Sequence, residues 1–117
     1  MNECLTLFLP YPPSVNTYWG FHGHRRFLTK KALEFKELVS KEIKAQPVRF
    51  GSEYLSLTLG LNPPDRRIRD IDNPIKPLLD SLVAAGLFDD DSQVKRLTIE
   101  MLDPIKGGVA TLKIVAL

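Results

Sequence analysis

Several features that would place this chain in a specialised class are missing. Its 117 residues contain one cysteine, Cys4, which excludes an intrachain disulfide and agrees with a reducing compartment. No apolar run approaches the roughly 18 residues that a membrane-spanning helix needs. The start of the chain has no basic region, and its apolar run breaks at Pro10, so it is a poor signal peptide. We therefore expect a cytoplasmic protein with no membrane partner.

Strong net charge and repetition are missing as well. Sixteen Lys and Arg residues against fourteen Asp and Glu residues give a formal charge of +2, which is too small to indicate nucleic-acid binding by itself. Nine prolines and seven glycines are spread along the chain, and no internal repeat is visible. With 44% hydrophobic residues, this length suits one compact domain, which we predict over residues 1–117.

Hydrophobic alternation predicts four strands. The clearest is 54–61, where every second residue is leucine, as in a strand buried on one face. In 94–101, we expect the residues Leu97, Ile99 and Met101 to face inward. The last two strands are predicted to form a hairpin, because only a short loop joins them. The remaining strands are predicted over 5–9 and 109–116.

Two amphipathic segments are predicted to be helices. The first has Thr29 as its N-cap and should end before Pro47. The second is predicted to start at Asn73–Pro74, because a residue before proline is disfavoured in helical conformation and suits a cap, and to stop at Gly86. The apolar stripe of the first helix comprises Ala32, Phe35, Leu38, Val39, Glu42 and Ile43.

The order strand, helix, strand, helix, strand, strand predicts an α/β (α+β) fold. We expect a single two-layer domain in which two main helices cover one face of a mixed four-stranded sheet.

Two groups of aspartates flank the second predicted helix. If 70–72 is extended, Asp70 and Asp72 project to one side. The strand that follows Asp91 is expected beside the one ending near Leu61, which would let Asp90 or Asp91 complete the group. Carboxylate oxygens are the ligands that Mg²⁺ prefers, and a bound ion would activate water beside a phosphate. Asp89 adds a third consecutive acid, so spacing alone does not say which of them is the ligand.

A simpler interpretation is equally compatible with this spacing. The acids after the helix would form a solvated turn, and Asp70 and Asp72 would pair with Arg67 and Arg69. Lys76 lies about one helical turn after Asp72, where it could orient a nucleophile or stabilise phosphate charge. It could also pair with Asp80, one turn further on.

Basic and aromatic residues suggest contacts with DNA. Guanidinium groups match phosphate oxygens, so Arg66, Arg67 and Arg69 are candidates, although such runs are often solvated surfaces. Tyr18 and Trp19 would either stack on exposed bases or cap the edge of the core. We interpret the segment with His22 and His24 as a plain loop, since no third metal ligand follows at a useful spacing.

The ordered set of motifs resembles the RusA-type Holliday junction resolvases, a family of crossover junction endodeoxyribonucleases. The resemblance spans nearly the whole chain, and the set is specific although each piece alone is weak. The matching residues are Leu9–Asn16 with its Pro-Pro-Ser-x-Asn pattern, Pro64–Asn73 with Lys76, Asp80 with Leu82 and Gly86, Asp90–Asp91 before Gln93–Val94, and Lys106–Gly108.

The resemblance implies an Mg²⁺-dependent endonuclease, with Mn²⁺ as a substitute and no organic cofactor. It implies a homodimer, often prophage-encoded, that resolves four-way DNA junctions by paired symmetric nicks in recombination and repair and works at the nucleoid. Asp70, Asp72 and Asp91 would be catalytic metal-binding carboxylates, Asp90 a neighbouring metal-binding acid, and Lys76 the residue on the base side. The expected DNA surface comprises Arg66, Arg67, Arg69, Asn73, Lys76, Tyr18 and Trp19.

Two alternatives remain open from the residues alone. One is a non-catalytic protein that binds branched DNA, although a pure binder should dispense with acids that repel phosphate. The other is an interaction domain whose charges are solvated.

Overall fold

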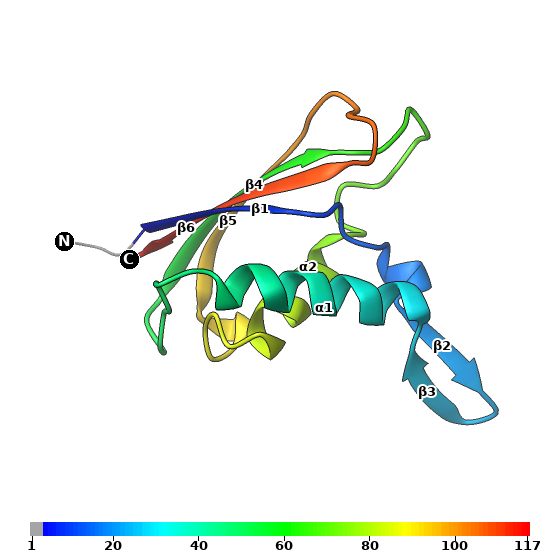
Figure 1. The fold of residues 1–117 in the computed structure, drawn as a ribbon, viewed down its shortest axis with the longest axis horizontal. Coiled ribbons are helices and arrows are strands. Elements are labelled where there is room, and N and C mark those ends of the chain that lie inside the picture. The colour runs from blue at the N-terminus through cyan, green and yellow to red at the C-terminus, as the bar shows by residue number, and fades with distance from the viewer. Residues whose placement is uncertain (1–3) are drawn as a thin grey trace.

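A four-stranded sheet covered on one face by two helices forms the body of the molecule (Figure 1). The computed structural model describes residues 4–117. The predicted two-layer α+β architecture is confirmed. The helices are α1 (Lys30–Lys44) and α2 (Ile75–Ala84), and the strands of the sheet are β1 (Cys4–Leu9), β4 (Leu55–Asn62), β5 (Val94–Met101) and β6 (Val109–Ala116).

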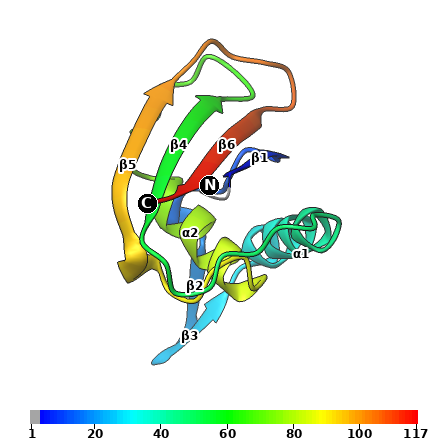
Figure 2. The same cartoon turned by 90° about the vertical axis from the view of Figure 1, so that its left-hand side faces the viewer.

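The strand order of the sheet is β1-β6-β4-β5 (Figure 2). β6 pairs antiparallel with β1 and β4, whereas β5 runs parallel to β4. The prediction that β5 and β6 form a hairpin is therefore wrong, because β4 lies between them. The α2 crossover returns the chain parallel to β4 at the edge of the sheet. The prediction that β5 neighbours β4 is confirmed.

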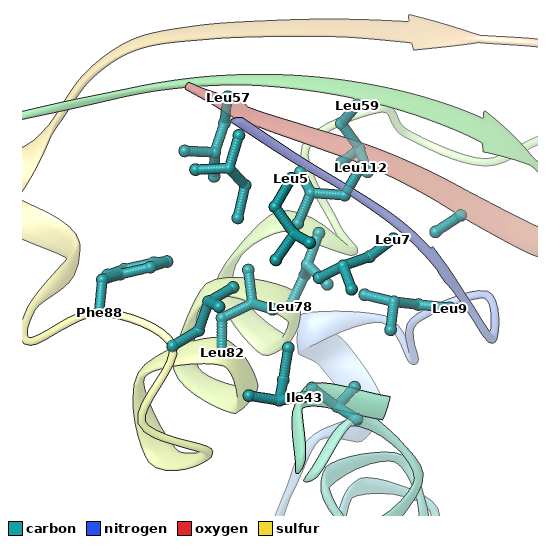
Figure 3. Packing of buried hydrophobic residues seen from close by; sticks show 14 of the residues in the cluster. Leu5, Leu7, Leu9, Ile43, Leu57, Leu59, Leu78, Leu82, Phe88 and Leu112 are labelled. Atoms are coloured by element: carbon teal, nitrogen blue, oxygen red, sulfur yellow. The ribbon is translucent and has the colours of Figure 1, made fainter. Parts of the chain in front are cut away.

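The hydrophobic core lies between the sheet and the helices (Figure 3). The four leucines of β4 are all buried, as the alternation predicted. Leu38 is 46% exposed and Glu42 is also exposed, so these two members of the predicted stripe on α1 face solvent. Leu97 is 40% exposed, because β5 is the edge strand. The helix residues in the core are Phe35, Val39 and Ile43 from α1 and Leu78 and Leu82 from α2.

Helix α2 begins and ends in ways that place the acidic segments. Residues 71–74 form a turn, and Pro74, not Asn73, is the N-cap, without a side-chain hydrogen bond. At the other end, Gly86 has a φ of +82° that favours glycine, so the predicted stop is confirmed. Its N–H donates to the Val83 carbonyl, and the N–H of Leu87 donates to the Leu82 carbonyl. Leu87 is buried, which directs the chain back toward the sheet.

A small antiparallel hairpin was missed in the sequence. β2 (Trp19–His22) pairs with β3 (Arg25–Leu28) in a segment that we predicted to be a loop. Most of its side chains are exposed, so no buried face imposes the alternation by which strands are recognised. No helix within residues 4–117 has the length and apolar character that crossing a membrane requires.

Candidate active site

The acidic segment after α2 forms a well-defined turn. Asp90 caps the short 3-10 helix η2 (Asp91–Gln93), and its carboxylate accepts hydrogen bonds from the N–H and the hydroxyl of Ser92. These bonds hold the pKa of the Asp90 carboxyl below its ordinary value. Asp89 and Asp90 are exposed, whereas Asp91 is half-buried. The turn thus presents Asp91 from a fixed backbone.

Gln93 attaches this turn to the rest of the fold. Its side chain is buried, and its Oε1 accepts the Asp90 N–H at 2.8 Å. Its Nε2 donates to the carbonyls of Gly51 at 2.9 Å and Glu53 at 2.6 Å. We predicted no role for Gln93 itself, because Gly51 and Glu53 lie about forty positions away in the sequence.

Lys76 joins the two ends of α2. Its Nζ lies 3.0 Å from a carboxylate oxygen of Asp80, which confirms the predicted pair, and 3.3 Å from Oδ2 of Asp91. The hydrogen bonds to Asp80 and Asp91 raise the pKa of Lys76 above its ordinary value. At neutral pH the amine is therefore protonated and acts here as a cation, not as a proton acceptor.

These groups line a cleft of about 300 Å³. Lys36 of α1 contributes a second ammonium group and was not among the site residues that we predicted. The cleft thus combines acids, cations and an aromatic ring, which are the groups needed to hold and polarise a phosphodiester. The lining residues that bear this chemistry are Trp19, Lys36, Lys76, Asp80, Asp90 and Asp91.

The structure separates the two aromatic residues predicted to stack on bases. Tyr18 is fully buried, so the expectation of stacking is corrected for this residue, although it is one of the residues that line the cleft. Burial raises the pKa of its hydroxyl. Trp19 is partly exposed, and the Arg26 guanidinium lies 3.9 Å from its ring centroid.

Asp72 lies in the turn at 71–74 and Asp70 lies directly before it, so the two do not belong to an extended segment. The Asp70 carbonyl accepts the Asn73 N–H at 3.3 Å, so the geometry assumed for a shared ion is not present. Asp70 lines a second cleft, of about 200 Å³, together with Lys31 and Arg69. Among the ion pairs of residues 4–117, none includes Asp70 or Asp72.

The nearby arginines pair elsewhere. Arg69 donates to Asp65 at 2.7 Å, and the Nε of Arg67 lies 3.8 Å from the same carboxylate. The simpler interpretation, in which Arg67 and Arg69 neutralise Asp70 and Asp72, is therefore wrong. The hydrogen bond from Arg69 lowers the pKa of Asp65 to about 2. Arg66 and Arg67 remain exposed.

Asn73 connects the first family motif with the central one. Its carbonyl accepts the N–H of Val15, which opens the 3-10 helix η1 (Val15–Thr17), at 2.8 Å. The proline-rich segment before η1 therefore lies against the turn that carries Asp70 and Asp72. The two motifs are neighbours in space although more than fifty residues separate them.

The residues do not form a ready-made metal site. Within the described part of the chain, no group of three or more His, Cys, Asp or Glu side chains is placed to hold one ion. The expected convergence of Asp70, Asp72 and Asp91 is thus not found. Asp91 instead contacts Lys76 at 3.3 Å, and residues 71–74 form a turn where an extended segment was expected.

Comparison with known proteins identifies the family. A family model described as "Endodeoxyribonuclease RusA" matches residues 10–115. The chain belongs to the RusA family. It is 36% identical over its whole length to the crossover junction endodeoxyribonuclease RusA of Enterobacteria phage HK97, covering 98% of that relative. The RusA proteins of Enterobacteria phage 82 and Escherichia coli K12 are 32% and 31% identical over 86% and 88% of this chain, and over 84% and 87% of their own lengths.

Family membership confirms the resemblance found in the sequence and makes the protein an endodeoxyribonuclease. The matched region contains the whole cleft, from Tyr18 to Asp91, and the central motif Pro64–Asn73. This DNA-cleaving enzyme thus carries acids on either side of α2, and Lys76 of α2 contacts two of them, Asp80 and Asp91.

Proposed function

We propose that this RusA-family enzyme resolves four-way DNA junctions by hydrolysing one phosphodiester bond in each of two opposed strands. The relatives from phage HK97 and E. coli K12 are named crossover junction endodeoxyribonucleases, which supports this substrate. The observation that carries the proposal is the contact between Lys76 and Asp91 inside a cleft that also holds Trp19. Action in recombination and repair follows from the same substrate.

Residues of the cleft and of the neighbouring segment 66–72 have proposed roles. Lys76, protonated at neutral pH, stabilises negative charge on the scissile phosphate. The carboxylates Asp70, Asp72 and Asp91 are the proposed catalytic acids. Arg66 binds a flanking phosphate through its guanidinium group. In this scheme, phosphate displaces Asp91 as one of the two partners of Lys76.

Mg²⁺ is the proposed cofactor, and Mn²⁺ a substitute. Support comes from Asp70 and Asp72, which have no basic partner among residues 4–117 and which would repel DNA without a cation. Mg²⁺ would supply Lewis acidity and an activated water when bound. We propose that cleavage requires the ion and assign it no ligand geometry, because the three acids are not gathered in one place.

A homodimer is also proposed. Paired nicks in opposed strands require two equivalent sites, which two-fold symmetry supplies directly. Sedimentation of the purified enzyme with and without junction DNA tests this. A mass of two chains is expected, and a single chain in both states would contradict it.

The test of the function is cleavage of a synthetic four-way junction, with a linear duplex of the same sequence as the substrate control. The wild type should cut the junction in two opposed strands with Mg²⁺ and not in EDTA. Asp70→Asn should bind the junction but cleave it roughly 10²–10³-fold more slowly, in the range seen for loss of one key electrostatic group. Asp89→Asn, an exposed acid outside both clefts and away from Arg66, is the matched control.

Two results would contradict the proposal. Equal cleavage by the wild type and Asp70→Asn would remove the role of Asp70. A gel shift of the junction without any metal-dependent product would favour the non-catalytic binder of branched DNA instead.

A further inference from the structure

The β2–β3 hairpin projects from the two-layer body beside the start of α1 (Figure 1). Its strands are joined by a two-residue turn, Gly23–His24, between the paired residues His22 and Arg25. Gly23 has a φ of +63°, a conformation that favours glycine, while His24 does not have a positive φ. This combination is typical of a type II′ turn, which suits a tight hairpin. The hairpin is thus a defined element with a free tip.

The base of the hairpin is held by Thr29. The Thr29 hydroxyl donates to the Thr17 carbonyl at 2.7 Å, and its N–H donates to the Tyr18 carbonyl at 3.1 Å. The same hydroxyl accepts the N–H of Ala32 and caps α1. Tyr18 is fully buried. These bonds orient the hairpin relative to α1 and to the cleft.

The hairpin is strongly basic for its size. Arg25 and Arg26 are exposed, and neither takes part in an ion pair within residues 4–117. No aspartate or glutamate occurs from residue 4 to residue 33. Although the overall charge is only +2, the charged side chains of residues 4–33 are all positive and complement phosphate.

One face of the hairpin continues into the cleft. The residues Trp19, Phe21 and Arg26 lie on this face, because the pairing places Phe21 opposite Arg26 and Trp19 two positions away. Arg26 stacks on Trp19, and Phe21 is 70% exposed. Trp19 also lines the cleft that contains Lys76 and Asp91. A surface of cations and aromatic rings thus runs from the candidate catalytic groups to the tip of the hairpin.

The opposite face is built differently. The ring of Phe27 lies across Gly20, where a Cβ would approach the ring atoms to 2.5 Å. Phe27 therefore covers the backbone of its own hairpin at Gly20. Of the two exposed phenylalanines of the hairpin, Phe21 is the one on the face that leads to the cleft.

We propose that the β2–β3 hairpin is a DNA-binding arm. Arg26 lies on the face that leads to the cleft, and Arg25 lies on the opposite face next to the tip. The two arginines contact phosphates on the two sides of the arm in the duplex branch next to the strand held in the cleft, and Phe21 packs against its sugars or unstacked bases. This inference rests on the proposed function, because it takes DNA as the ligand of the cleft.

The test compares two double variants that each remove two exposed cations. Arg25→Ala/Arg26→Ala alters the arm, and Lys41→Ala/Lys44→Ala removes the same charge from the opposite end of α1. Junction binding is measured in EDTA by fluorescence anisotropy across a range of salt concentrations. The arm variant should bind roughly tenfold more weakly or worse. The slope of log affinity against log salt should become shallower by about 1.8, since each phosphate contact contributes about 0.9.

The control should keep the affinity and the slope of the wild type. Equal losses in both variants would show an effect of net charge alone and overturn the proposal, as would an unchanged slope in the arm variant. A change in sedimentation of the arm variant would assign the hairpin to contacts between copies of the chain and also overturn it. A wild type that neither binds nor cleaves the junction would overturn the proposed function. An active wild type with two variants that behave alike would overturn only the proposal that the hairpin is a DNA-binding arm.

Discussion

Lys76, in the first turn of α2, and Asp91, beyond its C-terminal end, are fifteen positions apart in the sequence, yet Nζ of Lys76 lies 3.3 Å from Oδ2 of Asp91. Two features bring them together: the chain reverses after Gly86, and Gln93 attaches the turn formed by Asp89–Asp91, here called the acid turn, to the rest of the fold. The contact gives Asp91 a cationic neighbour and, after the hydrogen bond to Asp80, is the second cause of the raised pKa of Lys76. It explains how residues on either side of a helix belong to one cleft.

Replacing Lys76 distinguishes a cation from a base. We expect Lys76→Arg to retain much of the cleavage rate, because it keeps the charge, and Lys76→Met to lose roughly 10²-fold or more. The raised pKa of Lys76 means that its contribution to folding is complete below the unfolded pKa of about 10.4 and is lost as pH rises through the higher folded value.

Single-turnover cleavage assays with both variants are the measurement. Equal loss in Lys76→Arg and Lys76→Met would indicate a proton acceptor instead. Stability should change by no more than about 1 kcal/mol in either variant, because the Lys76 side chain is 58% exposed and exposed ion pairs contribute little.

Removing the amide of Gln93 should detach the acid turn. Gln93→Ala leaves the Gly51 and Glu53 carbonyls and the Asp90 N–H without this partner, so we expect a loss of about 2–3 kcal/mol in the free energy of unfolding. Urea denaturation measures it. A change below about 0.5 kcal/mol, typical of surface substitutions, would contradict this role.

Gln93→Glu separates hydrogen bonding from packing. Its carboxyl can donate to a carbonyl only when protonated, so its folded pKa should be raised. The variant should be most stable below the unfolded Glu pKa of about 4.3 and lose stability as pH rises through the folded value, whereas the wild type should not show this loss.

The pair of Asp65 and Arg69 makes a pH prediction. The pKa of Asp65 is lowered to about 2 chiefly by the hydrogen bond from Arg69, and the Arg67 N–H adds a second bond. The stabilisation is therefore present above the unfolded Asp pKa of about 3.9 and is lost as pH falls through about 2. In Arg69→Gln, the titration midpoint of Asp65, followed by NMR, should rise part of the way to 3.8. An unchanged midpoint would show that Arg69 is not the cause.

Trp19 offers a direct probe of the cleft, because it is the only tryptophan in the chain. Junction DNA that enters the cleft should change its fluorescence by stacking or by displacing Arg26. Titration of Asp91→Asn with junction DNA allows measurement without turnover. Tight binding, seen by anisotropy, with an unaltered Trp19 signal would place the DNA elsewhere.

The parts of the fold that the sequence predicted are those with strong periodicity. The leucines of 54–61 bury one regular face as predicted, and the helix after Thr29 does so except at Leu38 and Glu42, which face solvent. The hairpin at 19–28 buries little, and the separation of β5 from β6 depends on which strand fills the middle of the sheet. Neither can be read from local pattern.

The candidate site was predictable to a similar degree. Lys76 and Asp80 are one turn apart on a helix, which spacing reveals. The contact of Lys76 with Asp91 and the anchoring role of Gln93 depend on long-range packing. The turn at 71–74 changed the geometry expected for Asp70 and Asp72, because it replaced an extended segment that periodicity does not define.

The most direct test of the account compares neighbouring acids of the same turn. Asp91 contacts Lys76 in the cleft, whereas Asp89 is exposed and does not line that cleft. Single-turnover cleavage of a four-way junction is measured for Asp91→Asn and Asp89→Asn. We predict that Asp91→Asn falls by roughly 10²–10³-fold while Asp89→Asn stays within a few-fold of the wild type. Equal rates in the two variants would contradict the assignment of this cleft as the active site.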